Sequence, residues 1–524
     1  MKARKLSLPL LALLAVSANM EAQVMMQAPR LVVCITIDQL RNDYLGAFSP
    51  LYGGFGFKKI LDDGMLFSNV SFPFNTIDRA SAIATLATGA SPYYHSIVAS
   101  QWLDRETLRP VYCVDDDKSK GLLTTDCSSP KHLSTSTLGD ELKVFSQGKA
   151  LVYSIAPFRD AAVLAAGHAA DGAFWIDDET GEWCSTDYYA DDIPEWAVSY
   201  NDLYPAQKKI NGQEWTPGDY YTGSFSYFMS DANQKTFKHK FNGDRRYIEY
   251  KASALVNENV TRFALNCINN TGMGKDGVPD LLHITYYAGN FDHRTISECQ
   301  LEMQDTYVRL DAQIAELVSA LELKFGKRNV MFVVTSTGYS DEEITDYAKY
   351  RVPTGIFYIN RTAALLNMYY GALWGQGTYV ETCFGLQIFL NHKLLEDKRI
   401  SLADATQRAQ EFLSLCAGVR NVYTSQQLLS WSNELIDKER GGFNPERCGD
   451  ILVEVAPGWR MYNENNLQTQ LSRASYIPFP IIIYGGTIEK QRVDTPVTTD
   501  RIAPTIAKSI RIRAPNACSA EPLF

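Results

Sequence analysis

The chain has 524 residues, of which 45% are hydrophobic and 21% are charged, and its formal net charge is −10. This composition is typical of a globular protein with one large domain that carries insertions, or with two domains. The acidic balance argues against a nucleic-acid partner, because such sites need clustered Lys and Arg. We interpret the excess acid as a solvated surface.

The N-terminal residues 1–22 have the pattern of a signal peptide. Three basic residues precede the apolar run Leu6–Val16, and small residues follow at Ser17–Ala22. The apolar run is too short to span a bilayer, and no later segment is long and apolar enough to do so. We therefore expect an exported protein of the periplasm or cell surface, with no transmembrane span.

All ten cysteines lie beyond residue 22, and an oxidising compartment would permit disulfides. Cys113 and Cys127 bracket a short polar loop and are the favoured local pair. Cys34 and Cys267 lie in apolar runs, which indicates buried thiols. No spacing of Cys and His indicates a structural zinc site.

Apolar runs alternate with helical segments along the chain. The runs that predict buried strands are Leu31–Ile37, Leu281–Tyr287, Val330–Thr335 and Pro480–Tyr484, and the segments with helical spacing are Leu40–Leu51, Ile296–Lys324 and Arg501–Ile510. This alternation predicts an α/β fold with a mostly parallel central sheet flanked by helices. Ligands of such folds bind beyond the carboxyl ends of the strands, where Asp38, Asn290 and Ser336 lie.

Two segments interrupt the alternation. Residues 188–245 are rich in Tyr, Trp, Asp and Gly and predict a loop-rich cap. Residues 351–462 predict a smaller α+β insertion, with helices near Ser401–Leu415 and Ser425–Ile436. We interpret both segments as elaborations of a single domain that spans residues 23–524.

Six stretches carry a resemblance to a known family. They are Arg30–Leu40, Ala87–His95, Gly167–Trp183, Asp305–Asp311, Gly442–Trp459 and Asp500–Ala507. In this order they resemble the type I phosphodiesterase/nucleotide pyrophosphatase branch of the alkaline phosphatase superfamily, and in particular its exported bacterial alkaline phosphatases with a threonine nucleophile. The resemblance implies an alkaline-phosphatase-like sandwich, two zinc ions held by Asp and His, and Asn, Lys and Arg side chains on the phosphate oxygens.

The resemblance places Asp38 at the family's first metal-binding Asp, although an Asp that caps the following helix is an alternative. Two residues compete for the nucleophile. Thr76 has the right hydroxyl, but it is also an ordinary turn residue. Counting without gaps places Arg79 in the nucleophile position, where a permanently protonated guanidinium cannot act as a nucleophile. We expect Arg79 to supply a fixed positive charge beside Asp38, or else to form an ion pair unrelated to any site.

The phosphate-binding positions of the family are also changed. Ser100 stands where the family has Asn, and Phe158-Arg159-Asp160 stands where it has Lys-x-Arg. Arg159 lies one residue from either expected cation, and adjacent residues usually point in different directions. A carboxylate at Asp160 would repel a phosphate dianion.

The expected zinc ligands are substituted as well. Asn290 replaces an Asp, and Ser336-Thr337 replaces an Asp-His pair whose hydroxyls cannot hold zinc at neutral pH. Asp292 and His293 could form a weak metal site after a small shift, with a polar helix-start loop as the alternative.

The last family ligand is a His just before a strand such as Pro480–Tyr484. None of the seven histidines of this chain follows His392. Carboxylates without imidazole partners suit harder cations than zinc.

We therefore expect an exported protein of this fold that has lost two-zinc catalysis, has no cofactor and binds an unknown ligand or protein of the cell envelope. One alternative is an active metal-dependent phosphatase or phosphodiesterase that uses Asp38, Thr76, Asp292 and His293, with zinc or another metal. A second alternative is a glycan- or lipid-binding surface protein. In that case the aromatic residues of the segment Trp175–Phe228 would stack on sugars rather than close a core.

Overall fold

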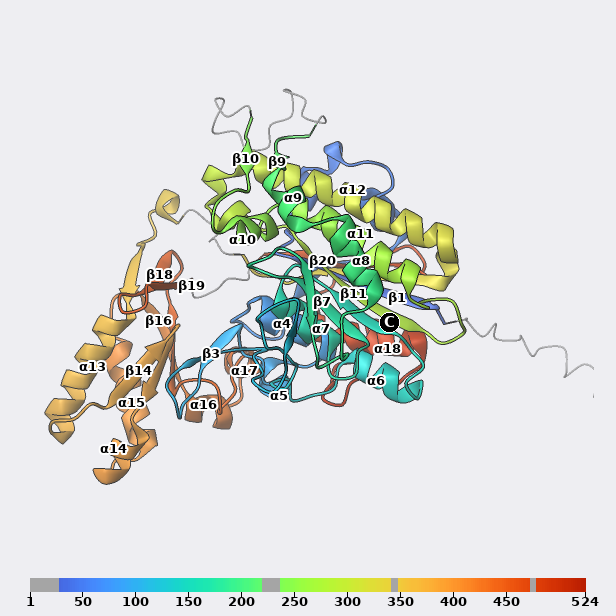
Figure 1. The fold of residues 1–524 in the computed structure, drawn as a ribbon. Helices are drawn as coiled ribbons and strands as arrows, with labels where there is room; N and C mark the ends of the chain where they lie inside the picture. The colour runs from blue at the N-terminus through green and yellow to red at the C-terminus, as the bar shows by residue number, and fades with distance from the viewer. Residues whose placement is uncertain (1–27, 219–235, 341–346, 472–476) are drawn as a thin grey trace, which may run out of the picture.

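The computed structural model describes residues 28–218, 236–340, 347–471 and 477–524 (Figure 1). The expected signal peptide, residues 1–22, lies outside this range. In the described part of the chain no helix is long and apolar enough to cross a membrane.

A mixed, eleven-stranded sheet forms the centre of the molecule. Its strands are β1 Leu31–Asp38, β2 Met65–Ser71, β5 Gly121–Leu122, β6 Val152–Ile155, β7 Gly172–Ile176, β8 Trp183–Thr186, β11 Asp280–Tyr287, β12 Val330–Ser336, β20 Phe479–Gly485, β21 Gln491–Val493 and β22 Val497–Thr498. Their order is β21-β2-β20-β12-β1-β11-β6-β7-β8-β5, with β22 paired to β2. β1 runs parallel to β11 and β12, whereas β20 is antiparallel to β12 and β2. The predicted α/β class with a mostly parallel sheet is therefore confirmed.

The apolar run of β1 is buried from both sides. Leu31, Val33 and Ile35 belong to the hydrophobic core on one face of the sheet, and Val32 belongs to the core on the other. Successive side chains of a strand point to opposite faces, so an uninterrupted apolar run needs cover on both.

Helices supply that cover in two layers (Figure 1). The helices of the first layer are α2 Asn42–Ala47, α3 Phe57–Asp63, α8 Glu195–Leu203, α9 Ala206–Asn211, α10 Arg246–Lys251, α11 Leu255–Asn270 and α12 Gln300–Phe325. Those of the second are α4 Arg79–Thr88, α6 Leu138–Phe145, α7 Arg159–Ala166, α16 Ser425–Ser430, α17 Glu434–Gly441 and α18 Ile502–Ile510, with the short α5 Pro92–His95 following α4.

Two predicted helices are divided in the structure. The segment Leu40–Leu51 forms α2 and a separate 3₁₀ turn at Ser49–Leu51, whose second residue is a proline. The segment Ser425–Ile436 forms α16 and the start of α17. The Asn433 side chain accepts a hydrogen bond from the Ile436 amide, which starts α17 as a new helix.

The aromatic segment proposed for sugar stacking is largely interior. Trp175, Trp183 and Trp215 are each at most 1% exposed, and Trp183 stacks on Phe263 with a centroid distance of 4.1 Å. The region contains α8, α9 and the hairpin of β9 Glu214–Trp215 with β10 His239–Lys240. Residues 219–228 lie outside the described residues. The three buried tryptophans close a core and do not offer a face to sugars.

The inserted segment folds around its own hydrophobic core and lies to one side of the central sheet (Figure 1). Its elements are β13 Gly355–Tyr358, α13 Ile359–Trp374, β14 Val380–Phe384, β15 Gln387–Leu390, α14 His392–Asp397, α15 Leu402–Leu413, β16 Val419–Thr424, β17 Ile451–Val455 and β18 Trp459–Asn463, and β19 Gln468–Leu471 extends it beyond residue 462. The helices α16 and α17 lie within residues 351–462 but pack on the core of the main domain. The sheet orders are β14-β15-β17-β16 and β13-β18-β19.

A β-hairpin from the main domain reaches the inserted segment. It consists of β3 Gln101–Leu103 and β4 Pro110–Tyr112. Arg105, at its turn, pairs with Asp450 at 3.1 Å between Nη2 and Oδ1.

The predicted disulfide between Cys113 and Cys127 is not formed. Cys113 is buried and Cys127 is exposed, and no disulfide joins them. Burial raises the pKa of the Cys113 thiol well above its ordinary value, which keeps it protonated.

The motif Asp305–Asp311 has a structural role that can be tested. The two carboxylate oxygens of Asp311 accept hydrogen bonds from the amides of Gly53 and Phe57, at 2.8 and 2.7 Å. Asp311→Ala leaves both amides without this partner, so we expect the free energy of unfolding to fall by about 2 kcal/mol. Urea denaturation measures the change. Ser319→Ala, at an exposed position of the same helix, is the control and should stay within about 0.5 kcal/mol of the wild type; equal stability of the two variants would contradict the assignment.

Candidate functional site

The carboxyl ends of β1 and β12 meet at Asp38. This residue is fully buried, and its Oδ1 accepts a hydrogen bond from the Thr337 hydroxyl at 2.8 Å. The Tyr339 hydroxyl lies 3.5 Å from Oδ2. The backbone amide of Gln39 donates to Thr337 Oγ1 at 2.9 Å, and the Ser336 hydroxyl donates to the Leu40 backbone carbonyl at 2.9 Å. The hydroxyl pair at the expected Asp-His position therefore ties two strand ends together. Asp38 caps no helix, because α2 begins only after Arg41.

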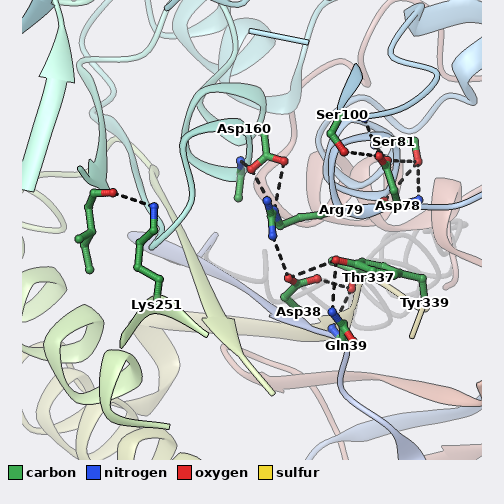
Figure 2. Close-up of polar contacts among 12 residues, drawn as sticks. Asp38, Gln39, Asp78, Arg79, Ser81, Ser100, Asp160, Lys251, Thr337 and Tyr339 are labelled. Carbon is green, nitrogen blue, oxygen red and sulfur yellow. Dashed lines mark hydrogen bonds and ion pairs between the residues drawn. The ribbon is translucent and has the colours of Figure 1, made fainter. Parts of the chain in front are cut away.

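Arg79, the first residue of α4, lies between two buried carboxylates (Figure 2). Its Nε lies 2.9 Å from Asp160 Oδ1 and 3.1 Å from Oδ2, and its Nη1 lies 3.4 Å from Asp38 Oδ2. The guanidinium carbon lies 3.8 Å from the centroid of the Phe158 ring. Asp38 and Asp160 are both 0% exposed. The charged groups that gapless counting placed together, Asp38 and Arg79, are in contact.

The electrostatics of this cluster determine what it can bind. Burial opposes the charge of Arg79, but the attraction of Asp160 and Asp38 outweighs it and holds the pKa of the guanidinium well above its ordinary value. A cation at the N-terminus of α4 opposes the helix dipole, so it depends on these carboxylates. Two carboxylates against one guanidinium leave no net positive charge for a phosphate.

The zinc ions implied by the sequence resemblance do not fit this donor set. Both oxygens of Asp38 already face hydrogen-bond donors, and a guanidinium occupies the position beside them. Across residues 28–218, 236–340, 347–471 and 477–524, no group of three or more His, Cys, Asp or Glu side chains is arranged to hold a metal ion. We derive no step through a metal.

The second set of expected ligands lies in a short 3₁₀ turn after β11. Asn290 Nδ2 donates to the Arg294 carbonyl at 2.8 Å, which closes this turn. Asp292 pairs with Arg245 at 3.4 Å, and the His293 ring lies 6.4 Å from the Tyr287 ring. Asp292 is thus turned to a surface arginine.

Two further candidates, Thr76 and Ser100, lie in the loop before α4 and directly before β3. The backbone amide and hydroxyl of Ser100 both donate to Asp78 Oδ2, and Asp78 Oδ1 accepts from the Ser81 amide at 2.9 Å. Ser100 therefore supports the cap of α4. Thr76 is exposed and lines the cleft described below.

Arg159 lies outside the cluster. It pairs with Asp115 at 3.1 Å and Asp126 at 3.3 Å, and its guanidinium lies 4.4 Å from the Tyr112 ring centroid.

The residue that sequence reasoning missed as a partner of Arg79 is Asp160. The charge reversal at the Lys-x-Arg position was the available signal, since a buried carboxylate needs a cation.

A cleft of 460 Å³ opens beside Arg79, between the main domain and the inserted segment. Its lining residues are Thr76, Asp78, Arg79, Val98, Ala99, Ser100, Gln101, Tyr112, Phe384, Gly385, Leu386, Gln387, Tyr423, Glu439, Gly442, Leu452, Val453, Glu454, Gln468 and Gln470.

The buried ion cluster predicts a loss of stability when its cation is removed. Arg79→Met removes the cation from two buried carboxylates, so we expect the free energy of unfolding at pH 7 to fall by about 3 kcal/mol. Urea denaturation at pH 7 measures the change.

Arg159→Met is the matched control, because its partners are partly exposed; we expect a loss of about 1 kcal/mol or less. Adding Asp160→Asn to Arg79→Met should recover part of the loss at pH 7, as residues in direct contact are coupled. A loss in Arg79→Met no larger than that in Arg159→Met would contradict the cluster.

Comparison with known proteins agrees with this architecture. Residues 32–476 match the type I phosphodiesterase/nucleotide pyrophosphatase family. The alkaline phosphatase PafA of Elizabethkingia meningoseptica is 26% identical over 540 aligned residues, which cover 98% of each chain. The alkaline phosphatase PhoV of Synechococcus elongatus is 24% identical and covers 93% of this chain and 91% of its own.

Solved structures show the same fold. The crystal structure of PafA aligns with a TM-score of 0.81 at 24% identity, covering 95% of this chain and 98% of that one. A phosphonoacetate hydrolase from Sinorhizobium meliloti 1021 aligns with a TM-score of 0.52 at 13% identity, covering 92% and 96%. The family match spans most of the chain, and the chain belongs to the type I phosphodiesterase/nucleotide pyrophosphatase family, with an alkaline-phosphatase-like fold.

Proposed function

We propose that this chain is an exported member of its family that no longer hydrolyses phosphate esters with two metal ions, and that it acts as a binding protein in the cell envelope. The observation that carries the proposal is the Arg79 guanidinium, held between Asp38 and Asp160. Export is supported by the signal-peptide pattern of residues 1–22.

Internal contacts at three of the positions expected for a two-metal site support the proposal. The metal-binding carboxylate faces Arg79, and the Ser336-Thr337 hydroxyls bond to β1. The position of the nucleophile holds a guanidinium that cannot attack phosphorus. A single distorted ligand would weaken an enzyme, whereas these contacts engage the expected metal-binding carboxylate and the expected nucleophile position together, which supports the proposal.

The relatives support a second candidate, an active phosphatase or phosphodiesterase. Two of the proteins that match nearly the whole chain are named alkaline phosphatases. Such an enzyme would need metal ligands from Asp38, Asp292 and His293, with Thr76 as nucleophile. The exposed position of Thr76 and the pairing of Asp292 with Arg245 favour the first proposal.

Metal content and turnover separate the two candidates. The chain is expressed in full, and the exported protein is assayed on aryl phosphate monoesters and diesters with zinc, manganese or magnesium. We expect no turnover above the protein-free control and no zinc retained at stoichiometric amounts. PafA, purified in parallel, controls for the assay conditions.

Turnover that Asp38→Ala abolishes would overturn the binding proposal. Asp292→Asn then tests the alternative metal set, because it removes a carboxylate but keeps the side-chain volume. Ser319→Ala, remote from the site, controls for nonspecific loss.

A further inference from the structure

The cleft beside Arg79 has one wall from each part of the molecule. Its main-domain wall includes Gln101 and Tyr112 of the β3–β4 hairpin. Its opposite wall includes Gln387 of β15, Tyr423 of β16 and Gln470 of β19. A volume of 460 Å³ suits a small ligand, in the range of ligand pockets generally.

The charges that line the cleft disfavour an anionic ligand. The lining carries three carboxylates, from Asp78, Glu439 and Glu454, and one cation, Arg79. Glu454 is paired with Arg420 at 3.5 Å, so Asp78 and Glu439 supply the negative charge of the lining. The Arg79 charge is already shared by two further carboxylates behind the wall (Figure 2). Among the described residues, neither lysine nor histidine lines this cleft. A phosphate or carboxylate in this space would face a like charge without a free cation.

The neutral polar groups of the cleft are held in defined orientations. The Oε1 atom of Gln468 accepts from the Gly385 amide at 3.0 Å, and that of Gln387 accepts from the Gly449 amide at 2.7 Å. These bonds engage the carbonyl oxygens of both side chains. The Gln387 side chain also hydrogen-bonds to Cys448, so Gln468 is the one of the two that offers its NH₂ group as a donor.

Acceptors lie on the same walls. The Tyr423 hydroxyl lies 3.4 Å from Glu454 Oε2, and Glu439 Oε1 accepts from Asn75. Amide donors and carboxylate acceptors together suit ligand hydroxyl groups, since each hydroxyl both donates and accepts.

We infer that the cleft between the main domain and the inserted segment binds a neutral, polyhydroxylated ligand of the glycan class. The inference rests on the proposed function, because it assigns the ligand class of the same site. It differs from the earlier glycan alternative, which placed the sugar on the aromatic segment now found in the core.

The test uses the full-length exported protein and defined sugars. The probes are short neutral oligomers of glucose, mannose, galactose and N-acetylglucosamine, with oligogalacturonate and glucose 6-phosphate as anionic counterparts. A glycan array first identifies the sugars that bind, and isothermal titration calorimetry then measures Kd for each of them. We expect at least one neutral oligomer to bind, and its anionic counterpart to bind at least about tenfold more weakly.

Two variants locate the binding. Gln470→Ala should weaken Kd for the neutral sugar by about three- to tenfold, the effect of one lost hydrogen bond. Glu439→Gln keeps the side-chain volume but removes a charge, so the discrimination against the anionic counterpart should shrink. Gln376→Ala, an exposed glutamine of the inserted segment outside the cleft, is the control and should leave Kd unchanged. Thermal unfolding verifies that each variant is folded.

Each outcome bears on a different claim. No binding of any neutral sugar, equal binding of the anionic sugars, or binding that ignores Gln470→Ala would overturn the glycan inference. Retention of a short cationic peptide such as trilysine, in place of sugars, would also overturn it and assign the cleft to cationic ligands. Phosphate ester turnover dependent on Asp38 would instead overturn the proposed function, whatever the sugars do.

Discussion

The arrangement of this site depends on one electrostatic constraint: two buried carboxylates require a cation between them. Asp38 comes from the end of β1 and Asp160 from the start of α7, and Arg79 reaches both from the first turn of α4. Removing any charge from water is costly, so each group is retained only with its partners. The cluster thereby joins two helices to the carboxyl end of β1.

Smaller contacts follow from the same substitution. The Arg79 guanidinium lies beside Asp38, and the carboxylate oxygens of Asp38 also face the hydroxyls of Thr337 and Tyr339. The Ser336 hydroxyl bonds to the Leu40 carbonyl and so holds the end of β12 against the turn after β1. Phe158 stacks under the guanidinium, where an aromatic face favours a cation. The site is therefore internally satisfied.

Much of the fold is predictable from the sequence, because the apolar runs of β1, β11, β12 and β20 avoid water only as strands of a sheet that is covered on both faces. Counting from Asp38 to Arg79 also predicts their contact. The pairing of Arg79 with Asp160 is less accessible, since it depends on how α4 packs on α7. The turn of Arg159 towards Asp115 depends on a loop conformation.

The cleft could not be predicted for a similar reason. Its lining comes from residues 76–112, 384–387, 423–454 and 468–470, which only the placement of the inserted segment brings together. The expected Cys113–Cys127 bond was wrong because nearness in sequence does not bring one buried and one exposed thiol within bonding geometry.

The bridging guanidinium also makes position 79 intolerant of small neutral side chains. Threonine at position 79 would leave Asp38 and Asp160 buried with no cation between them, at a cost of about 3 kcal/mol or more. That loss is a large fraction of the stability of a typical domain. A change at Arg79 is therefore tolerated best after a change at Asp160, so the two positions are coupled through the folding of the protein itself.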